Sequence, residues 1–104
     1  MRDFLDVEDV VDAYALLLEP SAPPGAYNVA SGRGVRIGDI LKQLLDRSYV
    51  QPQIEVAPER LRPADHAVGD AGRLRGATGW APRIPISATI ERLFADWRLR
   101  VRAA

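Results

Sequence analysis

The chain has 104 residues, enough for one domain with a modest core, since domains of about this size bury roughly two thirds of their unfolded surface. Its 14 basic and 14 acidic residues give a formal net charge of zero, which provides no overall field for nucleic acid or an anionic membrane surface. The absence of cysteine excludes disulfides, thiolate catalysis and cysteine metal sites. Because no apolar run approaches the ~20 residues of a membrane span, we expect a soluble, cytoplasmic protein without nucleic-acid or membrane partners.

The first predicted element is a helix over residues 7–18. Asp6 is placed to cap its N-terminus, and Glu19 and Pro20 are expected to end it. A metal site is one interpretation of the nearby acids, but the chain has one histidine and no calcium-loop spacing. They are better explained as a cap and first-turn acids favoured by the helix dipole. The helical period is carried by Val7, Val10, Val11, Tyr14, Leu17 and Leu18, and the acids are Asp3, Asp6, Glu8, Asp9 and Asp12.

The middle of the chain predicts a short strand followed by a second helix. Residues 26–30 carry Tyr27 and Val29 in alternation and are bounded by a Ser-Gly pair, which is typical of a strand. Arg36 stands at the start of the next helix, where its side chain offers no acceptor, so that helix start is weakened by about 1 kcal/mol. The apolar stripe of this helix comprises Ile37, Ile40, Leu41, Leu44 and Leu45.

The C-terminal half predicts a brief strand, a loop and two helices. Residues 54–56 alternate as a strand, and the prolines in residues 58–65 favour an irregular, extended loop. Asp70 can cap a short helix that Gly79 stops, after which Trp80 is expected to pack inward. Ser87 can cap a last helix with the stripe Ile90, Leu93, Phe94, Trp97 and Val101. Arg98, Arg100 and Arg102 are better explained as complements of that helix dipole than as a nucleic-acid surface.

Three segments resemble one family, in the same order. They are RDFLDVEDVVDAY from Arg2, GAYNVASGRGVRIGDILKQLL from Gly25, and RPADHAVGDAGRLRGATGWAP over residues 62–82. Together they resemble the C-terminal, substrate-binding part of an extended short-chain dehydrogenase/reductase of the NAD-dependent epimerase/dehydratase family, and cover nearly the whole chain. The resemblance implies an α/β, helix-rich C-terminal fragment of a Rossmann-type fold, with about four helices and two or three short strands, in which residues 1–104 form one substrate-binding portion.

The parts of that family that carry the redox chemistry are expected upstream of this segment. A catalytic Tyr-x-x-x-Lys pair is absent, because Tyr14, Tyr27 and Tyr49 are followed four residues later by Leu18, Ser31 and Gln53. The glycines Gly69, Gly72, Gly76 and Gly79 follow no convincing strand, as a dinucleotide loop requires. We therefore expect no catalytic residue, cofactor site or metal site in this chain, an upstream Rossmann portion that binds NADP or NAD, and no oxidoreductase activity from the chain alone.

The resemblance implies a nucleotide-sugar site at three residues. Arg62 is expected to approach the pyrophosphate, Asp65 to accept hydrogen bonds from the ribose hydroxyls, and Arg2 to contact phosphate; guanidinium groups suit phosphate because they form paired, planar hydrogen bonds. The structural alternative is that Arg62 and Asp65 pair on a surface loop and that Arg2 is a mobile terminal residue. His66 is better explained as a solvated loop residue than as a base.

The implied reaction of the complete protein is reduction of GDP-4-keto-6-deoxy-mannose at C4, with a GDP-sugar as partner. Within the family, the Ile84-Pro85 pair and the ADWR segment ending at Arg98 favour these reductases. A GDP-mannose 4,6-dehydratase or an NDP-sugar epimerase is the alternative within the family. An alternative of another class is a non-catalytic binding or oligomerising module, with self-association through an exposed strand edge.

Overall fold

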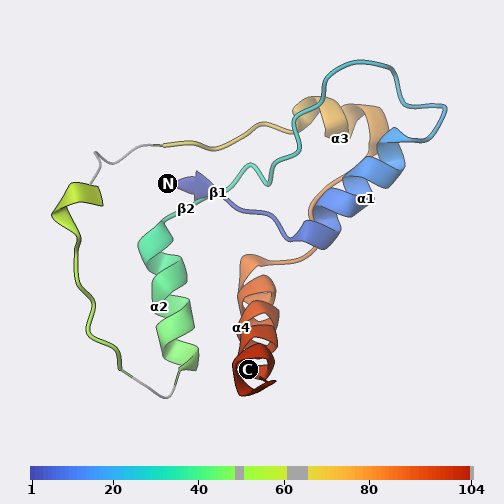
Figure 1. Cartoon of the computed structure of the whole chain (residues 1–104). Coiled ribbons are helices and arrows are strands. Elements are labelled where there is room, and N and C mark those ends of the chain that lie inside the picture. Colours follow the sequence, from blue (N-terminus) through green and yellow to red (C-terminus); the bar gives the residue numbers. More distant parts are fainter. Residues whose placement is uncertain (49–50, 61–65, 104) are drawn as a thin grey trace.

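The computed structural model describes residues 1–48, 51–60 and 66–103 and gives a helix-rich α/β chain, as predicted. Its elements are β1 (Arg2–Asp3), α1 (Val7–Leu17), β2 (Gly34–Val35), α2 (Ile37–Arg47), a 3₁₀ turn (Pro58–Arg60), α3 (Gly72–Thr78) and α4 (Ile86–Ala103) (Figure 1). Strands β1 and β2 pair antiparallel, with Arg2 opposite Val35 and Asp3 opposite Gly34. Within the described residues, no helix is both long and apolar enough to cross a membrane.

The core lies where α1 packs against α3 (Figure 1). Leu74 is fully buried, and Trp80 is only 3% exposed, which confirms its predicted inward packing. At the other end of the molecule, α2 and α4 run side by side, but no residue of α2 is buried. The buried cluster therefore belongs to one end of the chain and consists of Ala13, Ala30, Ala71, Leu74 and Trp80.

Local signals set the helix ends largely as predicted. Asp6 Oδ1 accepts the Glu8 N–H at 2.9 Å, and α2 begins after Arg36 without a side-chain cap. The N-cap of α3 is Ala71, which has no side-chain cap, so the prediction that Asp70 caps this helix is wrong by one residue. Asp70 Oδ1 does accept the Gly72 N–H at 2.8 Å, and α3 ends at Gly79, whose φ of +74° lies in the left-handed region, as predicted.

The start of α4 differs from the prediction. The helix already begins at Ile86, so Ser87 lies in the first turn and does not cap it. The carbonyl of Pro85 accepts the N–H groups of Ala88 and Thr89, and proline favours a helix start because its missing N–H leaves no donor unsatisfied. Of the predicted apolar stripe, Ile90 is buried and Phe94 half-buried, whereas Leu93, Trp97 and Val101 are exposed.

The strand predicted over residues 26–30 is wrong. Tyr27 and Val29 do pack against the core, but this segment has no strand pairing. Its backbone is held by Arg73, whose guanidinium donates to the Ala26 carbonyl at 2.7 Å and lies 4.7 Å from the centre of the Tyr27 ring. Tyr27 and Val29 are therefore packed inward as expected, but without backbone pairing to another strand. Residues 26–30 accordingly offer no strand edge for the predicted self-association.

The second predicted strand is also wrong. Residues 51–57 are irregular, and Ile54 and Val56 are exposed, because no described neighbour pairs with them and the flanking prolines, Pro52 and Pro58, lack N–H donors. Residues 58–60 form a 3₁₀ turn where an extended loop was expected, and the rest of that loop, residues 61–65, lies outside the described residues.

The overall shape is open. The radius of gyration is 17.2 Å, whereas a compact domain of this length has about 13 Å. The accessible surface is 8284 Å², against about 5,800 Å² for a compact monomer of this mass. Part of the excess of about 2,500 Å² is apolar, because one side of α1 exposes Val7, Val11, Tyr14 and Leu18.

Candidate functional site

Arg2 lies at the centre of the small sheet. Its backbone pairs with Val35 on one side and makes a parallel bridge to Ala67 on the other, and the Ala67 N–H donates to the Met1 carbonyl at 2.9 Å. Ala67 follows the predicted ribose-binding residue Asp65 by two positions. The structure thus fixes the chain just after Asp65 beside Arg2. Arg62 and Asp65 themselves lie outside the described residues, so their meeting with Arg2 stays a prediction.

Asp3 fixes this arrangement from the opposite side of β1, because successive side chains of a strand alternate between its faces. Its Oδ1 accepts the Ser31 N–H at 2.8 Å and the Ser31 hydroxyl at 2.7 Å. Its Oδ2 accepts the N–H groups of Gly32 at 3.0 Å and Gly69 at 3.1 Å. Burial acts to raise the pKa of Asp3, but these hydrogen bonds outweigh it and hold the pKa below its ordinary value. The carboxylate therefore stays charged and binds three segments together.

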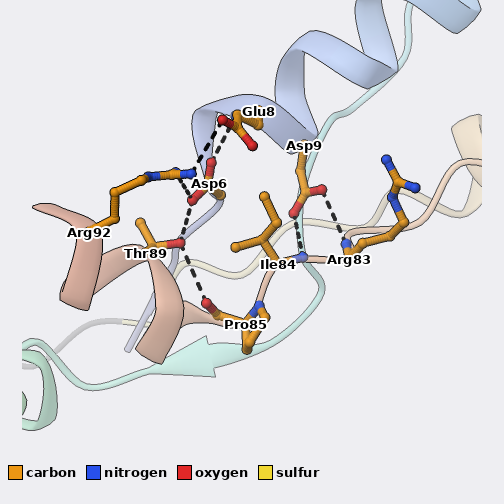
Figure 2. A network of polar contacts seen from close by, with 8 residues as sticks. All are labelled: Asp6, Glu8, Asp9, Arg83, Ile84, Pro85, Thr89 and Arg92. Atoms are coloured by element: carbon orange, nitrogen blue, oxygen red, sulfur yellow. Dashed lines mark hydrogen bonds and ion pairs between the residues drawn. The ribbon is translucent and has the colours of Figure 1, made fainter.

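Asp6 joins the start of α1 to α4 (Figure 2). Besides capping α1, it accepts hydrogen bonds through Oδ2 from the Arg92 guanidinium and, at 2.7 Å, from the Thr89 hydroxyl. Arg92 also lies 3.3 Å from Glu8 Oε1. The hydrogen bond from Arg92, followed by that from Thr89, lowers the pKa of Asp6 from 3.8 to about 2. Asp6 is therefore an ionised link between the two helices.

Asp9 binds the loop that leads into α4 (Figure 2). Its buried carboxylate accepts the N–H groups of Arg83 at 3.2 Å and Ile84 at 3.0 Å, and its backbone carbonyl accepts the Trp80 indole N–H at 2.9 Å. The predicted capping role of Asp6 is confirmed, but the roles of Asp3 and Asp9 were missed. The signal available in the sequence was their spacing, since Asp3, Asp6 and Asp9 recur every third residue.

The glycines of the third segment do not form a phosphate loop. Gly72 and Gly76 lie within α3 and Gly79 ends it, and the described residues just before them, from His66 on, contribute a single bridge at Ala67. A dinucleotide loop needs a buried strand, then a glycine turn, then a helix. His66, the first described residue after the predicted site, is exposed.

Comparisons with known proteins give relatives among nucleotide-sugar enzymes. No protein-family model matches the chain. GDP-6-deoxy-D-mannose reductase of Pseudomonas aeruginosa is 39% identical over 103 residues, which cover 97% of this chain and 34% of that protein. UDP-arabinose 4-epimerase 1 of Arabidopsis thaliana is 27% identical over 85 residues, covering 80% of this chain and 20% of that protein.

A solved structure agrees with these relatives. The structure of RMD from Pseudomonas aeruginosa complexed with NADPH matches with a TM-score of 0.77 and 37% identity, covering 91% of this chain and 31% of that chain. The chain thus spans about a third of the length of the reductase and a fifth of that of the epimerase. The resemblance carried by the three sequence segments is confirmed: over almost its whole length the chain is similar to the C-terminal part of an extended short-chain dehydrogenase/reductase of the NAD-dependent epimerase/dehydratase family.

Proposed function

We propose that this chain is the nucleotide-sugar-binding portion of an NAD(P)-dependent oxidoreductase that reduces GDP-4-keto-6-deoxy-mannose at C4. The observation that carries the proposal is the 39% identity, over 97% of the chain, to a GDP-6-deoxy-D-mannose reductase. The reaction adds a hydride to the C4 carbonyl carbon and a proton to its oxygen, giving GDP-6-deoxy-mannose. NADPH or NADH supplies the hydride, and an upstream Rossmann portion binds this cofactor.

In this proposal the chain contributes a site for the nucleotide diphosphate. Arg2 and Arg62 provide guanidinium groups for the pyrophosphate oxygens, and Asp65 accepts hydrogen bonds from the ribose. The arrangement of the sheet supports this assignment, because the bridge between Arg2 and Ala67 ties the strand that carries Arg2 to the segment that follows Asp65. The hydrogen bonds of Asp3 hold the same strand in place, which reduces the ordering cost of binding.

We also propose that the upstream Rossmann portion packs on the exposed side of α1. Four apolar residues recur there at heptad-like spacing and are 59–85% exposed, although one large apolar patch is rarely left open on a monomer. The excess accessible surface of about 2,500 Å² is ample for such a contact, since a standard interface uses about 800 Å² per partner. The residues are Val7, Val11, Tyr14 and Leu18.

The reaction can be tested on the complete protein, with the upstream portion present. Incubation with GDP-4-keto-6-deoxy-mannose and NADPH should oxidise one NADPH for each GDP-6-deoxy-mannose formed, measured by absorbance and chromatography. Conversion of GDP-mannose to its 4-keto derivative would instead identify a dehydratase and overturn the proposal. The 104-residue chain alone should transfer no hydride.

A second candidate is a nucleotide-sugar 4-epimerase. It is favoured by the match to UDP-arabinose 4-epimerase 1 over 80% of this chain. An epimerase inverts C4 without net consumption of NAD(P)H, so inversion of a UDP-sugar in the absence of added reductant would establish this activity. The reductase proposal is retained over it because the identity to the reductase is higher and extends over more of the chain.

Replacing Arg62 by alanine in the complete protein should raise the dissociation constant for GDP about 10- to 100-fold, because charge-assisted hydrogen bonds to the pyrophosphate are lost. Arg62→Lys should be weakened less, since lysine keeps the charge but loses the planar fork. Arg60→Ala is a matched control, because Arg60 is an exposed arginine of the same segment. Calorimetric titration checks the result, and equal affinities of Arg62→Ala and wild type would remove Arg62 from the site.

A further inference from the structure

A polar hollow lies beside the sheet, apart from the residues assigned to the nucleotide. Its volume is about 520 Å³, and it forms where the loop after the core residue Ala30 meets the segment leading into α3. Loops at such a junction expose backbone N–H groups and flexible cationic side chains that can contact a ligand. The residues that matter for its chemistry are Ser31, Gly32, Arg33, Gly69, Asp70 and Arg75.

Two arginines line this hollow from different segments. Arg33 belongs to the loop before β2, and Arg75 lies on α3. Among the described residues, neither guanidinium has a hydrogen bond or an ion pair. Five other arginines do form hydrogen bonds or ion pairs through their guanidinium groups, namely Arg47, Arg73, Arg83, Arg92 and Arg100. Two arginines that have no carboxylate partner among the described residues therefore line one polar space.

The charge of the hollow is positive but moderate. Asp70 also lines it, and Asp70 Oδ1 already accepts the Gly72 N–H at 2.8 Å. With two arginines and one aspartate the lining carries a net charge of +1 (2 − 1 = 1). Guanidinium groups bind tetrahedral oxyanions through paired hydrogen bonds, which makes a phosphate group a suitable ligand.

The loops around the hollow are held in place without a ligand. Asp3 accepts the N–H groups of Ser31, Gly32 and Gly69, all three of which line the space. Gly32 has a φ of +76°, a conformation that other residues adopt only with strain. Little of the binding free energy is then spent on ordering these loops. Arg2 lies on the opposite face of β1 from Asp3, so this hollow is separate from the proposed nucleotide site.

We propose that this hollow is a second anion site, in which Arg33 and Arg75 together bind a phosphate group. The site is independent of the proposed nucleotide-sugar function, since it uses neither Arg62 nor Asp65. It requires both arginines, because each comes from a different segment and the phosphate lies between them. The Asp70 carboxylate repels the phosphate and weakens binding. Removing the charge of either arginine should therefore lower the affinity, and removing the charge of Asp70 should raise it.

The test is a titration of the ¹⁵N-labelled 104-residue chain with inorganic phosphate at constant ionic strength. The amide resonances of Gly32 and Gly69 should shift in a saturable manner, with a dissociation constant on the order of 1 mM. Arg33→Gln and Arg75→Gln should each weaken binding by about fivefold or more, and Asp70→Asn should tighten it severalfold. Both arginines are exposed and make no side-chain bond in the described chain, so these variants should fold normally.

Two controls separate this site from general charge attraction and from the nucleotide site. Arg36→Gln removes an exposed arginine that does not line the hollow, and it should leave the titration unchanged. The titration is repeated in an Arg62→Ala background, where the proposed nucleotide site has lost an arginine, and the saturable shifts of Gly32 and Gly69 should persist there. Linear shifts without saturation, or equal affinities of wild type, Arg33→Gln and Arg75→Gln, would overturn the proposal.

Discussion

Replacing Asp6 by alanine should lower the free energy of unfolding by about 2–3 kcal/mol. The change removes the helix cap, which alone contributes up to about 2 kcal/mol, and also the acceptor of the Thr89 hydroxyl and the Arg92 guanidinium. The Asp6 side chain is fully buried in this network, so water does not replace the lost bonds directly. Urea unfolding of the 104-residue chain, followed by circular dichroism, measures the effect.

Asp12 provides the matched control for Asp6. It lies on the same helix and forms an ion pair with Arg83 at 3.0 Å, but both side chains are largely exposed. Exposed pairs contribute little, so Asp12→Ala should change the free energy of unfolding by less than about 1 kcal/mol. Equal losses for Asp6→Ala and Asp12→Ala would contradict the role assigned to Asp6.

The Asp6 contribution should also depend on pH. Its pKa is lowered from 3.8 to about 2 in the folded chain, so protons bind the unfolded state more readily. The stabilisation is therefore complete above the unfolded pKa and is lost as the pH falls toward the folded pKa. Asp6→Asn keeps a capping oxygen but has no charge to titrate. The difference in stability between wild type and Asp6→Asn should shrink between about pH 5 and pH 2, and a constant difference would refute the assignment.

Replacing Trp80 by alanine should cost about 3–5 kcal/mol, the largest single loss expected in the chain. The indole is 3% exposed and closes a cluster whose other members are mostly alanines, so few large side chains can move to fill the cavity. The substitution also removes the N–H donor to the Asp9 carbonyl. Since small domains have little stability to lose, Trp80→Ala should be largely unfolded in the absence of urea, as measured by circular dichroism.

Trp97 is the natural control, because it is the other tryptophan of the chain and is 55% exposed on α4. Trp97→Ala should change the free energy of unfolding by less than about 0.5 kcal/mol. Trp80→Phe, which keeps most of the volume but loses the hydrogen bond to Asp9, should fall between the two. If Trp97→Ala lowered the free energy of unfolding as much as Trp80→Ala, the assignment of the core to the cluster around Trp80 would be contradicted.

The sequence predicted the helices better than the strands, for a physical reason. Helix ends depend on residues a few positions away, such as Asp6 for α1 and Gly79 for α3. Strand formation depends on a distant partner. Residues 26–30 alternate like a strand, yet a side chain, that of Arg73, takes the Ala26 carbonyl. Conversely, β2 is only two residues long and forms because Asp3 lies opposite Gly34, which no local pattern reveals.

The candidate site was predicted from the resemblance and not from local chemistry. Arg2 can be placed because the sheet fixes its strand, and the bridge to Ala67 could not have been derived from either segment alone. Arg62 and Asp65 lie outside the described residues and remain predictions. The shared hollow of Arg33 and Arg75 was not predicted, because the two residues lie 42 positions apart in the sequence (75 − 33 = 42).

The hydrogen bonds of Asp3, Asp6 and Asp9 have a consequence for the order in which the protein folds during synthesis. Apart from the Glu8 N–H that Asp6 accepts, their partners lie 28 to 86 residues further along the chain. At about 5–20 residues per second, on the order of 10 s separates the translation of Asp9 from that of Arg92. Until Trp80 has been translated the core against α1 is incomplete, and until Arg92 has been translated α1 also lacks its ion pair with α4.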